Sequence, residues 1–245
     1  MPTLAASAKV QVGRGTKVRV APANCALIPP PDVTFTATAG AAAAATSITV
    51  TSTAVGTWAA NNPIDTNPYL QFVDPATGQE YLVKLNGNVA SGATTLTVEP
   101  LKKAIPASAV AIFPTILSVR ETANISTQDE NAEVVTFDND GWKDNIKTSL
   151  GWNTELNGPY LPTDAGYLNA QMSRLGFEDG ETAKVYVIIT LPKPGCENDT
   201  TYTKGASFRG FGLIEAMNIE SSAKGIITGN ISLTGCGKLT YELPS

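Results

Sequence analysis

The sequence of 245 residues contains no histidine, which excludes every mechanism that needs an imidazole base, the Ser-His-Asp and Cys-His arrangements included. Its three cysteines cannot supply the four ligands of a structural zinc site. Charged residues make up only 16%, and 17 basic against 22 acidic residues give a net charge of -5. Because no basic excess is present, the composition argues against a protein that grips nucleic acid through its phosphates.

Long apolar runs are also missing, and none reaches the roughly 18 residues that a membrane-spanning helix needs. The first residues lack the basic region and apolar core of a signal peptide, so we expect synthesis in a reducing cytoplasm. Three reduced, mostly buried thiols are then expected at Cys25, Cys196 and Cys236. A Cys196–Cys236 disulfide stays an open alternative.

The charge that is present is distributed unevenly. Residues 26–118 hold 8 of the 39 charged residues, and proline punctuates both ends of this stretch. We interpret 26–118 as an inserted small all-β domain, and 1–25 with 119–245 as one discontinuous core domain.

A weak repeat supports a β-rich insert. Residues 44–50 (AATSITV) resemble residues 92–98 (GATTLTV), and each copy is followed by a second apolar stretch, at 69–72 and at 110–113. Two copies predict a small barrel or sandwich. The alanine run 41–45 is too short to hold a helix by itself.

The core domain also reads as mainly β, with strands expected at 9–12, 17–20, 118–126, 182–191, 207–218 and 225–234. One amphipathic helix is predicted over 163–175, capped by Thr163 or Asp164 and ended by Gly176. Its apolar stripe, which we expect to face the core, consists of Leu161, Ala165, Leu168, Met172 and Leu175. The fold class is therefore a β-sandwich or barrel with one helix, plus the inserted domain.

A long hairpin connection is expected between Asp129 and Leu150. Loops of this length inside a domain are usually functional or disordered. This one carries a set of apolar residues: Val134, Val135, Phe137, Trp142 and Ile146. A solvated loop does not normally expose so much apolar surface, so we predict that a partner covers it.

Chemical sites are weakly indicated. The turn 138–141 (DNDG) fails the EF-hand pattern, because Thr136 and Lys147 fall where ligands belong. The glycines of 210–212 (GFG) lack the third glycine of a dinucleotide site and indicate instead a bulge or a close backbone approach. Adjacent carboxylates such as Glu178 and Asp179 have no sugar cleft beside them in the pattern. We therefore expect no enzyme activity, no cofactor and no metal.

Two segments resemble the bacteriophage tail tube (major tail) protein family. Residues 118–154, with the core 135–143 (VTFDNDGWK), resemble the first long hairpin of that family. Residues 202–237, with 208–212 (FRGFG), 219–221 (IES), 225–229 (GIITG) and 234–235 (TG), resemble its closing hairpin, and the helix at 163–175 has the family's position. The insert 26–118 departs from the family pattern.

The resemblance implies a structural virion protein of a long-tailed phage, whose hexameric rings stack into a tube through which DNA passes without specific binding. It implies partners in other copies of the chain and in other tail proteins, location in the virion tail, and assembly in the host cytoplasm. The family's ring-stacking loop would correspond to residues around Asp129, Val134, Val135, Phe137, Asp138, Trp142 and Ile146. A tail terminator, a decoration protein, and a carbohydrate-binding β-sandwich using Trp58, Trp142 and Trp152 are the alternatives.

Overall fold

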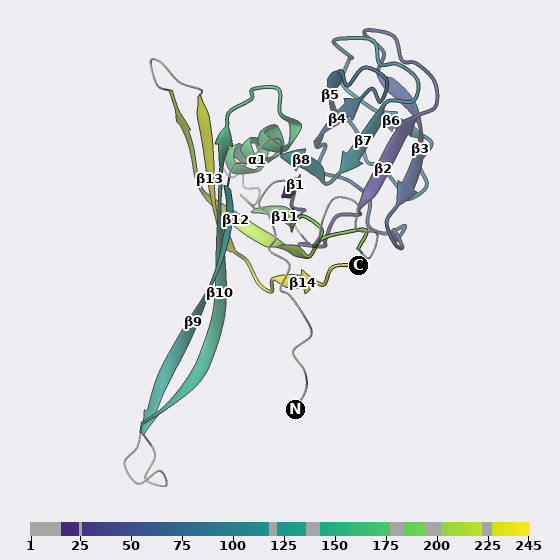
Figure 1. Cartoon of the computed structure of the whole chain (residues 1–245). Coiled ribbons are helices and arrows are strands. Elements are labelled where there is room, and N and C mark those ends of the chain that lie inside the picture. Colours follow the sequence, from purple (N-terminus) through teal and green to yellow (C-terminus); the bar gives the residue numbers. More distant parts are fainter. Residues whose placement is uncertain are drawn as a thin grey trace.

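The computed structural model describes residues 16–24, 26–117, 122–135, 143–176, 184–194, 202–221 and 227–245. Within these ranges the chain forms fourteen strands and one helix, arranged in two curled antiparallel sheets (Figure 1). The expected mainly-β class with a single helix is confirmed. The expected strand at 9–12 lies outside the described residues.

The larger sheet has the strand order β8-β1-β11-β12-β13-β10-β9, and β14 pairs with the start of β12. Its strands are β1 (Lys17–Pro22), β8 (Thr115–Leu117), β9 (Thr122–Val135), β10 (Lys143–Pro159), β11 (Lys184–Thr190), β12 (Ser207–Glu220), β13 (Thr228–Gly235) and β14 (Thr240–Glu242). The short strand β8 follows the smaller sheet in sequence but pairs with β1 of the larger one.

Alternating apolar residues of the larger sheet build its core. Val185, Val187 and Ile189 of β11 lie in one cluster with Ile231 and Leu233 of β13, as their spacing predicts. The opposite face of β11 is covered as well, because Tyr186 and Ile188 are 7% and 1% exposed. Strand β11 therefore lies fully inside the molecule.

The smaller sheet has the order β5-β4-β7-β2-β3-β6. Its strands are β2 (Val33–Ala37), β3 (Ser47–Ala54), β4 (Tyr69–Val73), β5 (Glu80–Lys84), β6 (Thr95–Thr97) and β7 (Val110–Phe113). The two edges meet just beyond β5 and β6, where Leu85 bridges to Val98 and Asn86 N donates to Thr97 O at 2.9 Å. The sheet is thus a small closed barrel with its own apolar core, which includes Phe35, Leu70 and Phe72.

The two sequence repeats pair with each other in this barrel. Ser47, Ile48 and Thr49 of β3 lie opposite Thr97, Leu96 and Thr95 of β6. Each copy is preceded by the same turn, in which Ala45 N donates to Ala42 O and Ala93 N donates to Ala90 O, both at 3.1 Å. The alanine run is therefore a turn and strand entry, as its short length indicated.

Helix α1 (Ala165–Gly176) begins where predicted, and Asp164 caps it by accepting from Gly166 N at 2.9 Å and Tyr167 N at 3.3 Å. The predicted buried stripe is confirmed at Ala165 and wrong at its four other members. Leu175 is 56% exposed, Leu161 is 41% exposed, and Leu168 and Met172 are only half-buried.

The face of α1 that packs inward carries mostly smaller side chains, namely Ala165, Gly166, Asn169, Ala170 and Ser173, together with Tyr167. A Cβ on Gly166 would lie 2.7 Å from the backbone of Ile116 and of Leu117 in β8. The helix approaches β8 too closely for leucine at this face. The leucines are displaced to its flanks for that reason.

Candidate assembly surfaces

The most prominent feature of the chain is the β9–β10 hairpin, which leaves the body as a long ribbon (Figure 1). Its ladder runs from Thr122 opposite Asn157 to Val135 opposite Lys143, with one register shift between Lys147 and Ser149. The expected loop between 129 and 150 is therefore wrong for most of its length, because both strands continue through it. Strand β9 is the edge of the larger sheet, so one side of its backbone has no partner strand among the described residues.

The predicted stacking residues divide into two groups. Asp129, Val134 and Val135 lie on β9 and Ile146 lies on β10, where Ile146 is opposite Ala132. Phe137, Asp138 and Trp142 lie outside the described residues, as does the DNDG turn. Leu150, at the body side of this segment, is 59% exposed.

Trp152 anchors the root of the hairpin. Its ring is 4% exposed and rests against Gly210, Gly212 and Gly235, where a Cβ on Gly210 would lie 2.8 Å from Trp152 Cζ2. The indole Nε1 donates to the carbonyl of Gly237 at 3.1 Å. The interpretation of the GFG segment as a close backbone approach is confirmed, since these glycines make room for one large ring.

A second apolar surface lies beside α1. A groove between the helix and the outer part of β12 is lined by Tyr167, Leu175, Met217 and Ile219 among others. Two of the groove's apolar side chains are largely exposed, Leu175 at 56% and Ile219 at 52%. Clusters of this kind mark contact surfaces more often than singly scattered leucines do.

The barrel is joined to the larger sheet by buried polar contacts. Asn169 of α1 is fully buried and pairs with the backbone of Tyr69 on β4, and Thr115 Oγ1 donates to Tyr69 O at 2.9 Å. These bonds satisfy the end of β4 that turns away from β7, since the two strands pair only at Val73 and Val110. No sequence pattern indicates this contact, because its partners are 100 residues apart.

A charged cluster fixes the other side of the junction. Arg19 of β1 binds Asp32 with both guanidinium nitrogens, at 2.6 and 3.0 Å, just before the barrel begins. Arg209 of β12 lies 4.0 Å from Asp32 and 2.9 Å from Glu242 of β14. Bidentate, half-buried pairs of this kind hold geometry better than exposed ones.

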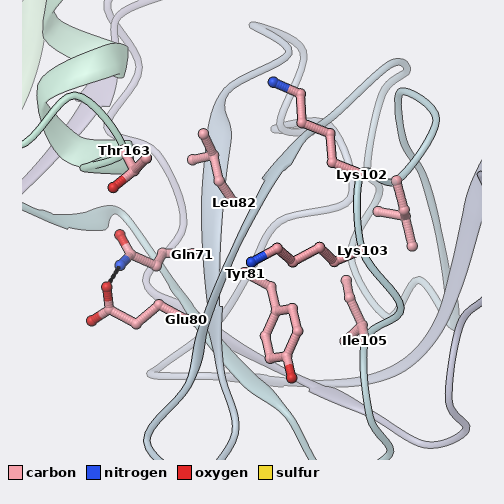
Figure 2. A pocket seen from close by; sticks show the side chains of 9 residues that line it. Gln71, Glu80, Tyr81, Leu82, Lys102, Lys103, Ile105 and Thr163 are labelled. Carbon is pink, nitrogen blue, oxygen red and sulfur yellow. Dashed lines mark hydrogen bonds between the residues drawn. The ribbon is translucent and has the colours of Figure 1, made fainter. Parts of the chain in front are cut away.

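A cavity of about 390 Å³ opens between the barrel and the segment that leads into α1. Gln71, Glu80, Lys102, Lys103 and Thr163 contribute its polar lining. Gln71 Nε2 donates to Glu80 at 2.5 Å, and Figure 2 shows Lys103 extending toward this pair while Lys102 extends in another direction. The sequence analysis did not single out these residues.

Several candidate sites are tested only in part. Within the described ranges, no group of three or more His, Cys, Asp or Glu side chains could hold a metal, and no helix is long and apolar enough to cross a membrane.

Cys236 is free and half-buried, whereas Cys25 and Cys196 lie outside those ranges. Trp58 and Trp152 are 8% and 4% exposed and serve packing, which leaves neither ring open for stacking on a sugar.

Comparisons with known structures find weak likenesses to several solved chains. One is to a chain in the tail of an empty gene transfer agent particle with C6 symmetry, at 16% identity over 50% of this chain and 81% of that one, with a TM-score of 0.36. Another is to a chain in the virion of a native gene transfer agent particle, at 15% identity over 51% and 86%, again with a TM-score of 0.36. At this level they carry no argument about function. No family model and no curated relative matches the chain.

Proposed function

We propose that this chain is the repeating subunit of a phage tail tube, a structural virion protein whose hexameric rings stack around a channel for DNA. The observation that carries the proposal is strand β9. It is 14 residues long, forms the edge of an eight-stranded sheet and lies on a hairpin that leaves the body (Figure 1). Proteins seldom leave so long an edge open, because it invites pairing with another chain.

The root of the hairpin supports an assembly role. Trp152 fixes β10 to β12 and β13, so the ribbon is held at a defined angle to the body rather than hinged on a loose loop. The sequence resemblance to tail tube hairpins falls on the same segments, 118–154 and 202–237. A rigid projecting ribbon is suited to reach a neighbouring subunit at a fixed place.

In this proposal the barrel, residues 33–113, belongs to the inserted outer domain 26–118, since a module of this size would block a channel that must pass DNA. Six copies at -5 each give about -30 formal charges per ring. A negative lumen repels the phosphate backbone and lets DNA slide without being held. Other copies of the chain and further tail proteins are the proposed partners, and DNA is cargo only.

Negative-stain electron microscopy of the purified protein tests the proposal. Rings or tubes of uniform width are expected from the wild type. Thr127→Lys places a charge at an exposed position of the β9 edge, and Trp142→Ala alters the segment beyond it; both should give folded monomers that do not polymerise. Thr53→Lys, at an exposed position of the barrel, is the matched control and should leave tubes intact.

A wild type that stays monomeric over a wide range of concentration and salt would refute the tube assignment. Full-length tubes formed by Thr127→Lys would refute the role of the β9 edge. A tail terminator would instead be expected to stop at single rings.

A further inference from the structure

The strands β12, β13, β10 and β9 have one face that is packed and one that is open to water. On the packed face, Leu156, Ile231 and Leu233 lie in one cluster with side chains of α1. Because side chains alternate between the two faces of a strand, the residues between them point away from the helix. This open face is largely amide and hydroxyl, and its central positions are Asn153, Glu155, Asn157, Asn230, Ser232 and Thr234, all exposed or half-buried.

The charges on the open face have one sign. The parts of the four strands whose side chains the structure describes are residues 123–128, 150–159, 213–220 and 228–235. They contain Glu155, Glu215 and Glu220, all three exposed, and no lysine or arginine. Such a face stays hydrated and offers a polyanion no cation to bind.

The three carboxylates keep their charge unpaired. None of them forms an ion pair within the described part of the chain. Glu215 accepts a hydrogen bond from Thr234 Oγ1 at 2.5 Å, which holds its carboxylate on this face. Across the sheet, the first basic residue beyond β12 is Lys184 of β11, which is half-buried opposite Leu213. The negative potential of the open face is therefore not cancelled by its immediate neighbours.

The position of the helix and the barrel decides which way this face points in a ring. Figure 1 shows α1 and the barrel on the same side of β10, β12 and β13. Asn169 of α1 also bonds the helix to Tyr69 of the barrel. If β9 pairs with the next subunit, the sheet continues around the ring and one of its faces points to the axis. The side that carries the helix and the barrel is too bulky to lie in a channel, which leaves the open face.

We propose that the open face lines the channel, and that Glu155, Glu215 and Glu220 are charges that passing duplex DNA meets there. The inference rests on the proposed function, because the ring supplies the axis. It assigns the repulsion of DNA to particular positions rather than to the net charge of the whole chain. Between these carboxylates the wall presents only neutral amides and hydroxyls, so no phosphate is held.

Helical reconstruction of wild-type tubes by electron cryomicroscopy tests the orientation without any substitution. Glu155 and Asn230 are expected at the channel wall, with α1 and the barrel on the outside of the tube. A channel lined by α1 or by the barrel would overturn the inference and leave the tube assignment standing. A wild type that forms neither rings nor tubes would refute both.

Charge reversal tests the effect on DNA. Subunits with Glu155→Lys and Glu215→Lys are assembled with short duplex DNA, treated with DNase and pelleted. We expect roughly tenfold more nuclease-protected DNA than in wild-type tubes, because the wall then binds phosphates instead of repelling them. The matched control carries Asp65→Lys and Glu80→Lys, the same change in charge at exposed positions of the insert. DNA bound to the outside of the control tubes should be digested.

Equal protection of DNA by the two variants, or protection by neither, would refute the role of Glu155 and Glu215. If the lysine variant fails to assemble, Glu155→Gln with Glu215→Gln takes its place, since it removes the charge without adding bulk. Tubes of that variant should protect more DNA than wild-type tubes, by a smaller factor. Protection at the wild-type level would then refute the proposal.

Discussion

Asn169 on α1 and Tyr69 on β4 pair as two neighbouring strands do, although one partner is a side chain. Asn169 Oδ1 accepts from Tyr69 N at 2.6 Å, and Asn169 Nδ2 donates to Tyr69 O at 2.9 Å. The amide of a fully buried helix residue thus substitutes for a missing strand at the mouth of the barrel. It ties α1, which packs on the larger sheet, to β4 of the barrel.

Asn169→Ala should lower the free energy of unfolding by about 2–3 kcal/mol, because Tyr69 N is left buried without an acceptor while Tyr69 O keeps Thr115. Urea denaturation measures the change. Gln171→Ala, at a half-buried position of the same helix, is the control and should cost less than about 1 kcal/mol. If both variants lost the same free energy of unfolding, the pairing with Tyr69 would contribute no more to stability than an ordinary helix position.

Gly235→Ala should be strongly destabilising, since the new Cβ would overlap the indole of Trp152. A loss of about 3 kcal/mol is expected, at the upper end of overpacking effects. Trp152→Leu in the same chain should recover part of this loss, because the smaller side chain vacates the space. Gly151→Ala, whose Cβ would meet no atom closer than 3.8 Å, is the control in differential scanning calorimetry.

The barrel turns offer a stabilising change. Ala44 has a φ of 65° at the position where the matching repeat has Gly92. Ser108 has a φ of 69° in a third turn of the same kind. Left-handed backbone costs a non-glycine residue about 1–2 kcal/mol. Ala44→Gly and Ser108→Gly should each raise stability by about 0.5–1 kcal/mol, part of the gain being offset by the greater freedom of glycine when unfolded. Gly92→Ala should have the opposite sign; a rise in Tm for that variant would contradict the argument.

Tyr186 predicts a dependence on alkaline pH. Burial raises the pKa of its hydroxyl, only partly opposed by the nearby Arg209. A group whose pKa is higher when folded contributes its stability fully below the unfolded pKa, about 10, and loses it as the pH rises through the folded value. Wild type should therefore lose more stability above pH 10 than Tyr186→Phe does. Chemical denaturation at a series of pH values measures the difference. If the stability of the two proteins fell in parallel above pH 10, ionisation of Tyr186 would be excluded as the cause.

The sequence was most informative where the determinants are local. The cap at Asp164, the alternation in β11 and the repeat at 44–50 and 92–98 all depend on neighbouring residues, and the structure has each of them. The buried face of α1 was misjudged because side-chain size, set by the distance to β8, outweighs hydrophobic spacing there. The Asn169 pairing and the Arg19–Asp32 pair join residues distant in the chain or on separate elements, so no periodicity could indicate them. The sequence predicts a long hairpin connection between Asp129 and Leu150, whereas cross-strand pairing of β9 with β10 keeps most of this segment extended.

The closure of the barrel between Leu85 and Val98 has a consequence for growth by strand addition. A sheet whose borders are joined presents no free backbone row along which a further chain could align. Among the described residues, the eight-stranded sheet ends at the three-residue β8 and at the long β9, so β9 is the strand along which extended pairing with another subunit can occur. A closed barrel can therefore be gained or lost during evolution without exposing a second strand edge on which fibres could grow.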